Sequence, residues 1–234
     1  RSARDTYIEF VSEYNCGYVH AGGSYTAMLA IQNFELRDID ALYEGKWFWR
    51  DSSKYSPHNL FTNTENLYKA TAEGHSWTEA PVYATWNFVD DADLPNGITS
   101  GDTATEVNIE FGGSYDVTYT YNADAKYYER ANAGVTQVDA NNDRTLSVRN
   151  IILQHVPAGD YIEGKGRVNF SVTGEGVVEV IRNGVVTTGT WKKADRLDRT
   201  RFYDEAGVEI PLARGNTWVE VVPEGYTTRF TPVP

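Results

Sequence analysis

An Asn-Gly dipeptide at positions 183 and 184 places the strongest restriction on the fold. It lies between residues 177–182 and 185–191, two segments rich in Val, Ile and Thr, which favour strands. Asn-Gly accepts the positive φ angles of a type I′ turn, and the twist of this turn matches that of two antiparallel strands. The sequence therefore predicts an antiparallel hairpin in the C-terminal part of the chain.

Other strand patterns surround this hairpin. Residues 107–111 and 117–121 alternate apolar and polar side chains, as half-buried strands do. A more continuously apolar run predicts a central strand at residues 150–153. Shorter strands are expected at residues 126–130, 201–203, 208–210 and 218–222.

The first ninety residues combine helix and strand signals. Ser2 and Thr62 each precede an acidic residue by three positions, the capping-box pattern of a helix start, and Ser24 is expected to cap a third helix. Short strands are expected at residues 18–20 and 47–49. The predicted fold class is α+β, with a mixed helix/strand N-terminal part followed by a largely antiparallel β-sheet C-terminal part.

The composition changes near residues 90–103, where Asp, Gly and Pro gather. This segment predicts either a linker or a long loop. We expect a mixed α/β part at residues 1–90, an acidic loop or linker at residues 91–103, and a β-rich part at residues 104–234. The first and last parts are expected to pack together as one unit.

Charge and composition exclude several classes of protein. Lys and Arg number 21 and Asp and Glu 33, so the net charge is −12, which disfavours a nucleic-acid partner. The chain has no apolar run approaching the ~18 residues of a membrane-spanning helix. Cys16 is the one cysteine, which rules out an intrachain disulfide scaffold.

The sequence predicts neither a metal nor a cofactor. Asp139, Asn141 and Asp143 match the start of a calcium loop, but Arg144 and Asn150 occupy the positions of its Gly and its Glu. The four histidines lack zinc-ligand spacing, and the glycines form no phosphate-binding motif. A polar hairpin loop is the expected role of residues 139–143.

Polar residues gather at the predicted element ends of the first sixty positions. Arginines there could clamp a carboxylate or phosphate, and a histidine could transfer a proton. The alternative is a structural network of ion pairs and helix caps. We predict that the following residues converge into one ligand-binding site: Arg4, Asp5, His20, Arg50, Asp51, His58 and Asn59.

Tryptophans offer a second kind of surface in the same part of the chain. Trp47, Trp49, Trp77 and Trp86 could form a wall on which a sugar stacks. Core packing is the alternative for each of them.

Several motifs resemble the YerB-like family of bacterial lipoproteins, a family of unknown function. They include Arg-Ser-Ala-Arg-Asp at residues 1–5, an aromatic-Arg-Asp motif at 49–51 and Pro-His-Asn-Leu at 57–60. Residues 18–24, 148–153, 189–193, 199–204 and 215–218 extend the likeness over nearly the whole chain. The resemblance implies a two-part α/β protein, usually anchored outside the cytoplasmic membrane through a lipidated N-terminal Cys.

The chain departs from the family pattern at its start. Family members carry a signal, a lipid anchor and a further segment before the stretch that opens this chain, and Cys16 is not the lipidation residue. We therefore expect Arg1 to mark a cut. The only membrane contact expected is through the lipid anchor of the full-length protein, and this form lacks that anchor. The preceding segment is expected to pair with the sheet, either as a bound peptide or replaced by a strand from a neighbouring copy.

Two functional hypotheses follow. The first is an extracytoplasmic, cell-envelope-associated binding or structural domain without catalysis, whose partner is a cell-wall polymer, an envelope protein, the missing N-terminal segment or a second copy at an open sheet edge. The second is a hydrolase or transferase that acts on an anionic envelope substrate through Arg, His and Asp side chains. A histidine in an open cleft beside an acid and an arginine favours the enzyme, whereas buried, mutually paired side chains favour the binding domain.

Overall fold

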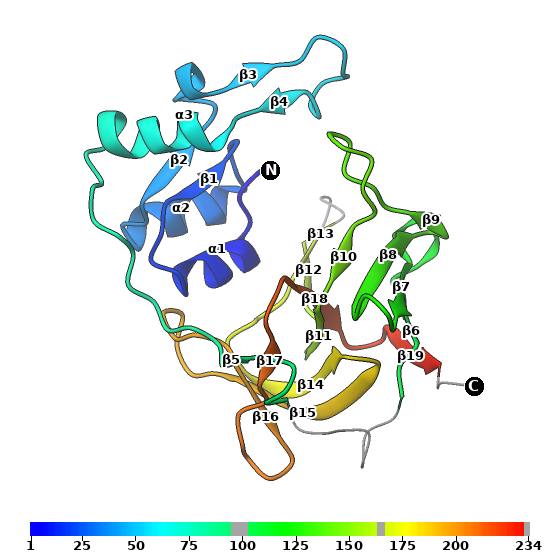
Figure 1. Ribbon diagram of the computed structural model, residues 1–234. Coiled ribbons are helices and arrows are strands. Elements are labelled where there is room, and N and C mark those ends of the chain that lie inside the picture. The colour runs from blue at the N-terminus through cyan, green and yellow to red at the C-terminus, as the bar shows by residue number, and fades with distance from the viewer. Residues whose placement is uncertain (95–102, 163–166, 232–234) are drawn as a thin grey trace. The chain divides into compact units, whose positions relative to one another are not determined.

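A computed structural model describes residues 1–94, 103–162 and 167–231 of the chain (Figure 1). The chain forms two compact units: Arg1–Ala84 with Asp195–Arg199, and Thr85–Ala194 with Thr200–Pro234. The first boundary thus falls six residues before the predicted transition at residues 90 and 91. Most of the expected loop or linker at residues 91–103 lies outside the described residues.

The first unit contains short helices and short strands. Its first four elements form a helix followed by a β-α-β motif, in which β1 and β2 pair in parallel. These elements are α1 (Asp5–Ser12), β1 (Tyr18–His20), α2 (Tyr25–Asn33) and β2 (Asp38–Asp40). They are followed by the 3₁₀-helix η1 (Gly45–Trp47), β3 (Trp49–Arg50), β4 (Leu60–Phe61), α3 (Thr64–Lys69) and the π-helical turn η2 (Ala70–Gly74).

The predicted caps of the first two helices have different outcomes. Ser24 caps α2 as expected, because its Oγ accepts a hydrogen bond from the N–H three residues later. Ser2 does not cap α1, whose N-cap is Arg4. The reason is that Ala3 pairs with the loop after β1, donating its N–H to the carbonyl of Gly22 at 2.8 Å.

The start of α3 and the neighbouring strand also differ from the prediction. Asn63 caps α3 by accepting a hydrogen bond from the N–H of Asn66 at 2.8 Å. Thr62, the predicted cap, donates its hydroxyl to the carbonyl of Trp47 instead. Trp47 ends a 3₁₀-helix, so the strand expected at residues 47–49 begins only at Trp49.

A distant segment of the chain completes the first unit. Arg196 donates to Oγ of Ser12 at 2.8 Å and lies over the ring of Phe34 at 4.0 Å. Arg199 forms a buried ion pair with Glu13 at 3.1 Å. Two arginines from residues 195–199 thereby fasten this segment to the C-terminal ends of α1 and α2.

The second unit is built mainly of strands (Figure 1). Its main sheets have the strand orders β10-β8-β7-β6-β19, with β9 paired to β8, and β16-β15-β14-β11-β18. The strands of the first sheet are β6 (Glu106–Glu110), β7 (Val117–Asn122), β8 (Tyr127–Asn132), β9 (Val135–Thr136), β10 (Ser147–Val148) and β19 (Thr227–Thr231). Those of the second are β11 (Asn150–Val156), β14 (Gly174–Arg182), β15 (Val185–Lys193), β16 (Arg201–Asp204) and β18 (Thr217–Pro223).

Small pairs complete the unit. They are β5 (Phe88–Val89) with β17 (Leu212–Ala213) and β12 (Asp160–Ile162) with β13 (Arg167–Asn169). A 3₁₀-helix, η3 (Gly113–Tyr115), links β6 and β7. Among the described residues no helix has the length and apolar character needed to cross a bilayer.

The two main sheets share one apolar core. Val107, Tyr119 and Tyr128 of the first sheet are buried in the same cluster as Ile151 and Leu153 of β11. The predicted hairpin is confirmed: Asn183 and Gly184 have φ angles of 50° and 78° between β14 and β15. The expected central strand is also confirmed, because β11 lies between β14 and β18. The fold class is α+β, as predicted, although β18 pairs with β11 in parallel.

Candidate functional site

The seven predicted site residues lie in two groups within the first unit. Arg4, Asp5 and His20 surround the loop between β1 and α2. The other four lie on the β3–β4 hairpin, which Figure 1 shows at the opposite end of this unit from α1. The structure therefore brings the residues together within each group, and not as one set of seven. A ligand-binding role for either group stays a prediction.

His20 is buried at the C-terminal end of β1, with 2% of its surface exposed. Its Nδ1 lies 3.0 Å from the carbonyl oxygen of Gly22, and its Nε2 lies 3.0 Å from Oδ2 of Asp38. A carbonyl and a carboxylate can only accept, so both ring nitrogens donate when Asp38 is ionised. Burial opposes this charge, but the hydrogen bonds to Asp38 and Gly22 and the negative charge of Asp40 raise the pKa of His20 overall.

The neighbours of His20 are also engaged in hydrogen bonds. Asp40 accepts the N–H groups of Gly22 and Leu42 through Oδ1 at 2.8 and 3.0 Å. Asp5 accepts the hydroxyl of Thr26 at 2.8 Å. The hydrogen bonds of His20 and Asp40 thus join β1, β2 and the loop before α2, and that of Asp5 joins α1 to the start of α2.

The hairpin group is open to solvent. Arg50 donates to Oδ1 of Asn59 at 2.7 Å, across the two strands. Asp51 accepts the hydroxyl and the N–H of Ser53, and these hydrogen bonds lower the pKa of its carboxyl. His58 is exposed in the connecting loop. These side chains stabilise the turn of the hairpin while remaining accessible.

The predicted tryptophan wall separates into different environments. Trp47 is buried in the core beneath α3, whereas Trp49 is 44% exposed and stacks on Phe61 with ring centres 6.3 Å apart. Trp77 stacks on a histidine ring. Trp86 belongs to the second unit, where its Nε1 donates to the carbonyl of Thr200.

The calcium-like run at residues 139–143 forms a turn that satisfies its own groups. Asp139 accepts the N–H of Asn141 at 2.8 Å, and its backbone N–H donates to the carbonyl of Arg144. Asp143 has a positive φ of 56°, as turn residues often do. Within the described part of the chain, no group of three or more His, Cys, Asp or Glu side chains is arranged to hold a metal ion.

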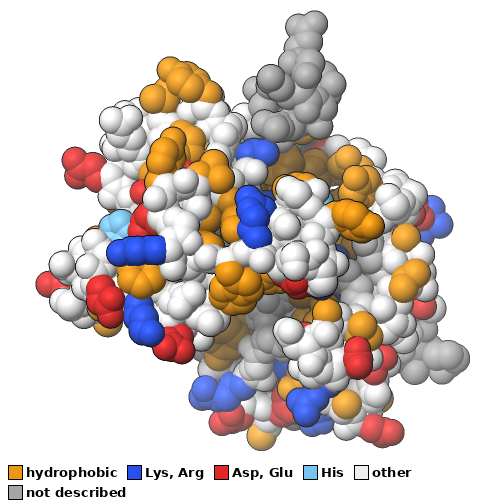
Figure 2. Space-filling view, turned by 90° about the horizontal axis from the view of Figure 1, so that it is seen from above, with side chains coloured by type: hydrophobic (Ala, Val, Ile, Leu, Met, Phe, Trp, Pro, Cys, Tyr) orange, Lys and Arg blue, Asp and Glu red, His pale blue; other side chains and the backbone are white. Residues whose placement is uncertain are grey.

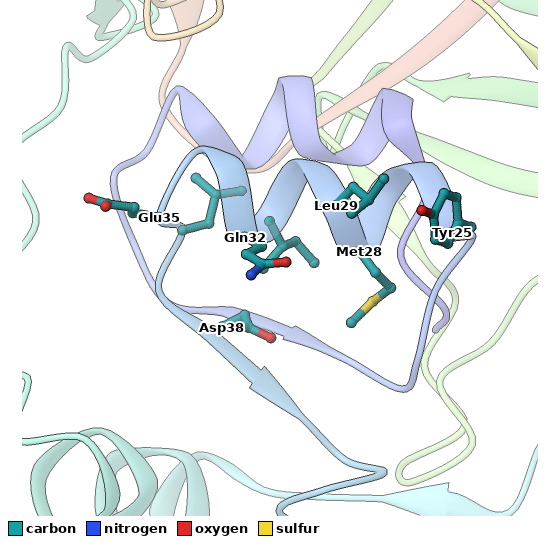
Figure 3. Close-up of a pocket in the computed structure, with 8 residues that line it drawn as sticks. Tyr25, Met28, Leu29, Gln32, Glu35 and Asp38 are labelled. Carbon is teal, nitrogen blue, oxygen red and sulfur yellow. The ribbon is translucent and has the colours of Figure 1, made fainter.

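A groove of about 450 Å³ runs along the outer side of α2 above the start of β2 (Figure 3). Its lining is mostly apolar, with one amide and two carboxylates. In Figure 3, Met28, Leu29 and Gln32 project from α2, and Asp38 lies below them at the start of β2. The lining residues are Tyr25, Met28, Leu29, Ile31, Gln32, Glu35, Leu36 and Asp38.

The backbone beside the groove is an open strand edge. Tyr18 donates its N–H to the carbonyl of Arg37, and Ala41 donates its N–H to the carbonyl of His20, so these groups of the β2 segment face β1. Because backbone direction alternates along a strand, the N–H and C=O of Asp38 point away from β1. Among the strands that the structure describes, β2 pairs with β1 alone.

Sequence reasoning missed this groove. Ala27 and Ile31 form the buried stripe of α2, whereas Tyr25 and Leu29 are 78% and 38% exposed. These exposed apolar residues and Gln32 recur at the i, i+4 and i+7 spacing of a second helix face. That second stripe, made of two apolar residues and an amide, was the available signal.

The surface of the first unit also carries exposed aromatic side chains. Tyr43, Tyr55 and Tyr68 are 85%, 93% and 76% exposed. Figure 2 shows hydrophobic side chains gathered in patches on the viewed face, with charged side chains between them. Patches of this kind often mark interaction surfaces.

Comparisons with known proteins agree with the architecture. Residues 1–77 match the N-terminal domain of DUF3048, and residues 107–219 match its C-terminal domain; both are described as proteins of unknown function. The crystal structure of the YerB protein from Bacillus subtilis has the same fold, with a TM-score of 0.82 and 22% sequence identity over 98% of this chain and 76% of that one. The search of curated proteins gives no match. Because two domains of one family match in order along most of the sequence, the chain belongs to the YerB-like DUF3048 family of unknown function.

Proposed function

We propose that this protein is a non-catalytic binding domain of the cell envelope that captures an extended segment of a partner protein along β2. The observation that carries the proposal is the apolar groove on α2 beside an open strand edge. Proteins often bind extended peptides by adding them to such an edge as a further strand.

The edge offers the backbone contacts that this binding mode needs. The outward N–H and C=O of Asp38 can each bond to one residue of an incoming strand. Alternate side chains of that strand point toward the same face, so residues two positions apart can enter the groove together. Backbone bonds then supply affinity, while the groove selects the side chains.

The lining determines the chemistry of the partner. Met28, Leu29 and Leu36 suit one apolar side chain. Glu35 and Asp38 suit a basic side chain at the next position on the same face. The net charge of −12 also attracts basic partners over a distance. The proposed ligand is therefore an extended envelope-protein segment with an apolar and a basic residue two positions apart.

The side chains of the first predicted group support a binding role over catalysis. A general base must reach the proton that it removes, and His20 is buried with both ring nitrogens bonded to acceptors. A hydrolase or transferase that uses this histidine on an anionic envelope substrate is therefore disfavoured. The partner could instead be a cell-wall polymer, and the binding test described below distinguishes this case.

The extracytoplasmic location rests on the family resemblance, whose members are lipoproteins outside the cytoplasmic membrane. Protease treatment of intact cells that produce the full-length protein tests this location. We expect degradation of the protein without lysis. Protection until the cells are lysed would contradict an exposed location.

The binding test uses a designed eight-residue peptide with Leu and Lys two positions apart. Fluorescence anisotropy of the labelled peptide gives the dissociation constant. A second peptide, with Pro between Leu and Lys, serves as a control because Pro has no backbone N–H to donate. We expect Leu29→Glu to weaken binding at least about tenfold, because it places a charge in the apolar groove. Val135→Glu is the matched control, since Val135 is 70% exposed and lies on β9 of the second unit.

The two variants separate groove binding from general charge effects. Equal weakening by Leu29→Glu and Val135→Glu would overturn the proposal, and so would binding of the Pro peptide as tight as that of the parent peptide. Binding of soluble cell-wall fragments that compete with neither peptide, together with no binding of the Leu-Lys peptide, would favour a polymer partner instead.

A further inference from the structure

Three arginines are buried among the described residues of the second unit, and one of them differs from the other two. Arg130 is 9% exposed and pairs with Glu220 at 3.2 Å. Arg149 is 5% exposed and pairs with Asp91. Arg182, at the end of β14, is 9% exposed and forms no ion pair within the described parts of the chain. Its Nη1 is fully buried and has no hydrogen-bond partner.

An unpaired buried guanidinium is unusual because desolvating a charge is costly unless an opposite charge compensates. Desolvation lowers the pKa of Arg182 to about 10, so the side chain still carries its positive charge at neutral pH. The other two buried arginines, Arg130 and Arg149, each form an ion pair with a carboxylate.

The sheet positions around Arg182 supply no acid. Its register partners are Asn150 on β11 and Val185 on β15, and Val180 precedes it on the same face of β14. The amide of Asn150 is fully used: it donates to the carbonyl of Ala213 and to a threonine hydroxyl, and it accepts the N–H of Ala213. These neighbours leave the guanidinium without a compensating group.

We propose that Arg182 is the anchor of a binding site for a small oxyanion, of the phosphate or carboxylate class. The planar fork of a guanidinium binds two oxygens of such an ion at once, and the ion supplies the negative charge that the described neighbours of Arg182 do not. Nη1 is buried, but 9% of the residue as a whole remains exposed, so the proposed ion reaches the guanidinium from that side. This site belongs to the second unit and is independent of the peptide groove.

The test measures the thermal stability of the full chain in increasing inorganic phosphate, with sodium chloride at matched ionic strength as the reference. A ligand that binds only the folded state raises Tm with its concentration. We expect roughly 3–5 °C for each tenfold increase in phosphate above the dissociation constant. A parallel titration with acetate distinguishes a carboxylate from a phosphate ligand, and the anion that acts at the lower concentration identifies the class.

Variants assign the effect to Arg182. Arg182→Met should remove the anion-dependent rise in Tm without lowering Tm in chloride, since it removes an uncompensated charge. Arg214→Met is the control for net charge, because Arg214 is exposed and paired with Asp90, and it should respond as the wild type does.

Two results would overturn the inference. One is a wild-type Tm that neither anion raises beyond the chloride reference, and the other is an equal rise in Arg182→Met. If that variant does not fold, NMR of the wild-type guanidinium groups tests the site instead. A saturable shift of the Arg182 signal with phosphate or acetate supports the site, and an unchanged signal refutes it.

Discussion

Replacing His20 by Gln tests whether a buried imidazolium holds β1 and β2 together. The two acceptors of His20 require both of its nitrogens to donate, and its pKa is raised in the folded state. A raised pKa means that the folded state binds the proton more tightly than the unfolded chain does. The stabilisation is therefore complete below the unfolded pKa near ~6.5 and is lost as the pH rises through the folded pKa.

The magnitude follows from the contact with Asp38. A hydrogen bond to a charged group contributes about 1.5–3 kcal/mol when buried. The histidine side chain is fully buried, but that of Asp38 is 30% exposed, so solvent screening reduces the interaction. We expect the pH-dependent part to be about 1–2 kcal/mol of unfolding free energy.

Urea unfolding of the wild type and of His20→Gln at about pH 5.5 and about pH 9 measures this contribution. The other three histidines are common to both proteins, so the difference between the two proteins isolates His20. We expect this difference to be larger at the lower pH by about 1–2 kcal/mol. A difference that is the same at both pH values would refute the imidazolium, because a neutral histidine contributes equally at both.

Three further changes should alter the urea-unfolding free energy. Gly22→Ala should cost about 1–2 kcal/mol, because Gly22 has φ +60° and an added methyl lies 2.8 Å from Cδ1 of Leu42; an unchanged midpoint would contradict this. Arg130→Met should cost about 3–5 kcal/mol by leaving the buried charge of Glu220 unpaired, and adding Glu220→Gln should restore part of it. Leu153→Ala should cost about 2–5 kcal/mol because Leu153 is fully buried in β11, and a loss below 1 kcal/mol would show that the core collapses around the gap.

Local signals were enough to locate the main elements of the second unit. The turn at Asn183 and Gly184 and the central strand at residues 150–153 depend on backbone preference and apolar pattern, which a short segment contains in full. Helix capping was less reliable, since Ser24 caps α2 but Ser2 does not cap α1. The extended pairing of Ala3 took precedence over the local capping preference.

Long-range pairing lay beyond these signals. Nothing in residues 195–199 indicated that Arg196 and Arg199 would contact α1 and α2, because their partners lie more than 160 positions away. The parallel pairing of β11 with β18 was missed for the same reason. Alternation of side chains identifies a strand but does not name its neighbour.

The candidate sites show most clearly the difference between what local sequence predicts and what long-range contacts decide. The sequence by itself determined which residue types were available: His20, the apolar face of α2 and the arginines. Only the tertiary structure decided that His20 is buried against Asp38, that Leu29 remains exposed beside an open edge, and that Arg182 is buried with no ion-pair partner among the described residues. The physical reason is that burial and charge compensation depend on groups brought together by folding, so the same side chain can be a structural tie, a binding surface or an uncompensated charge.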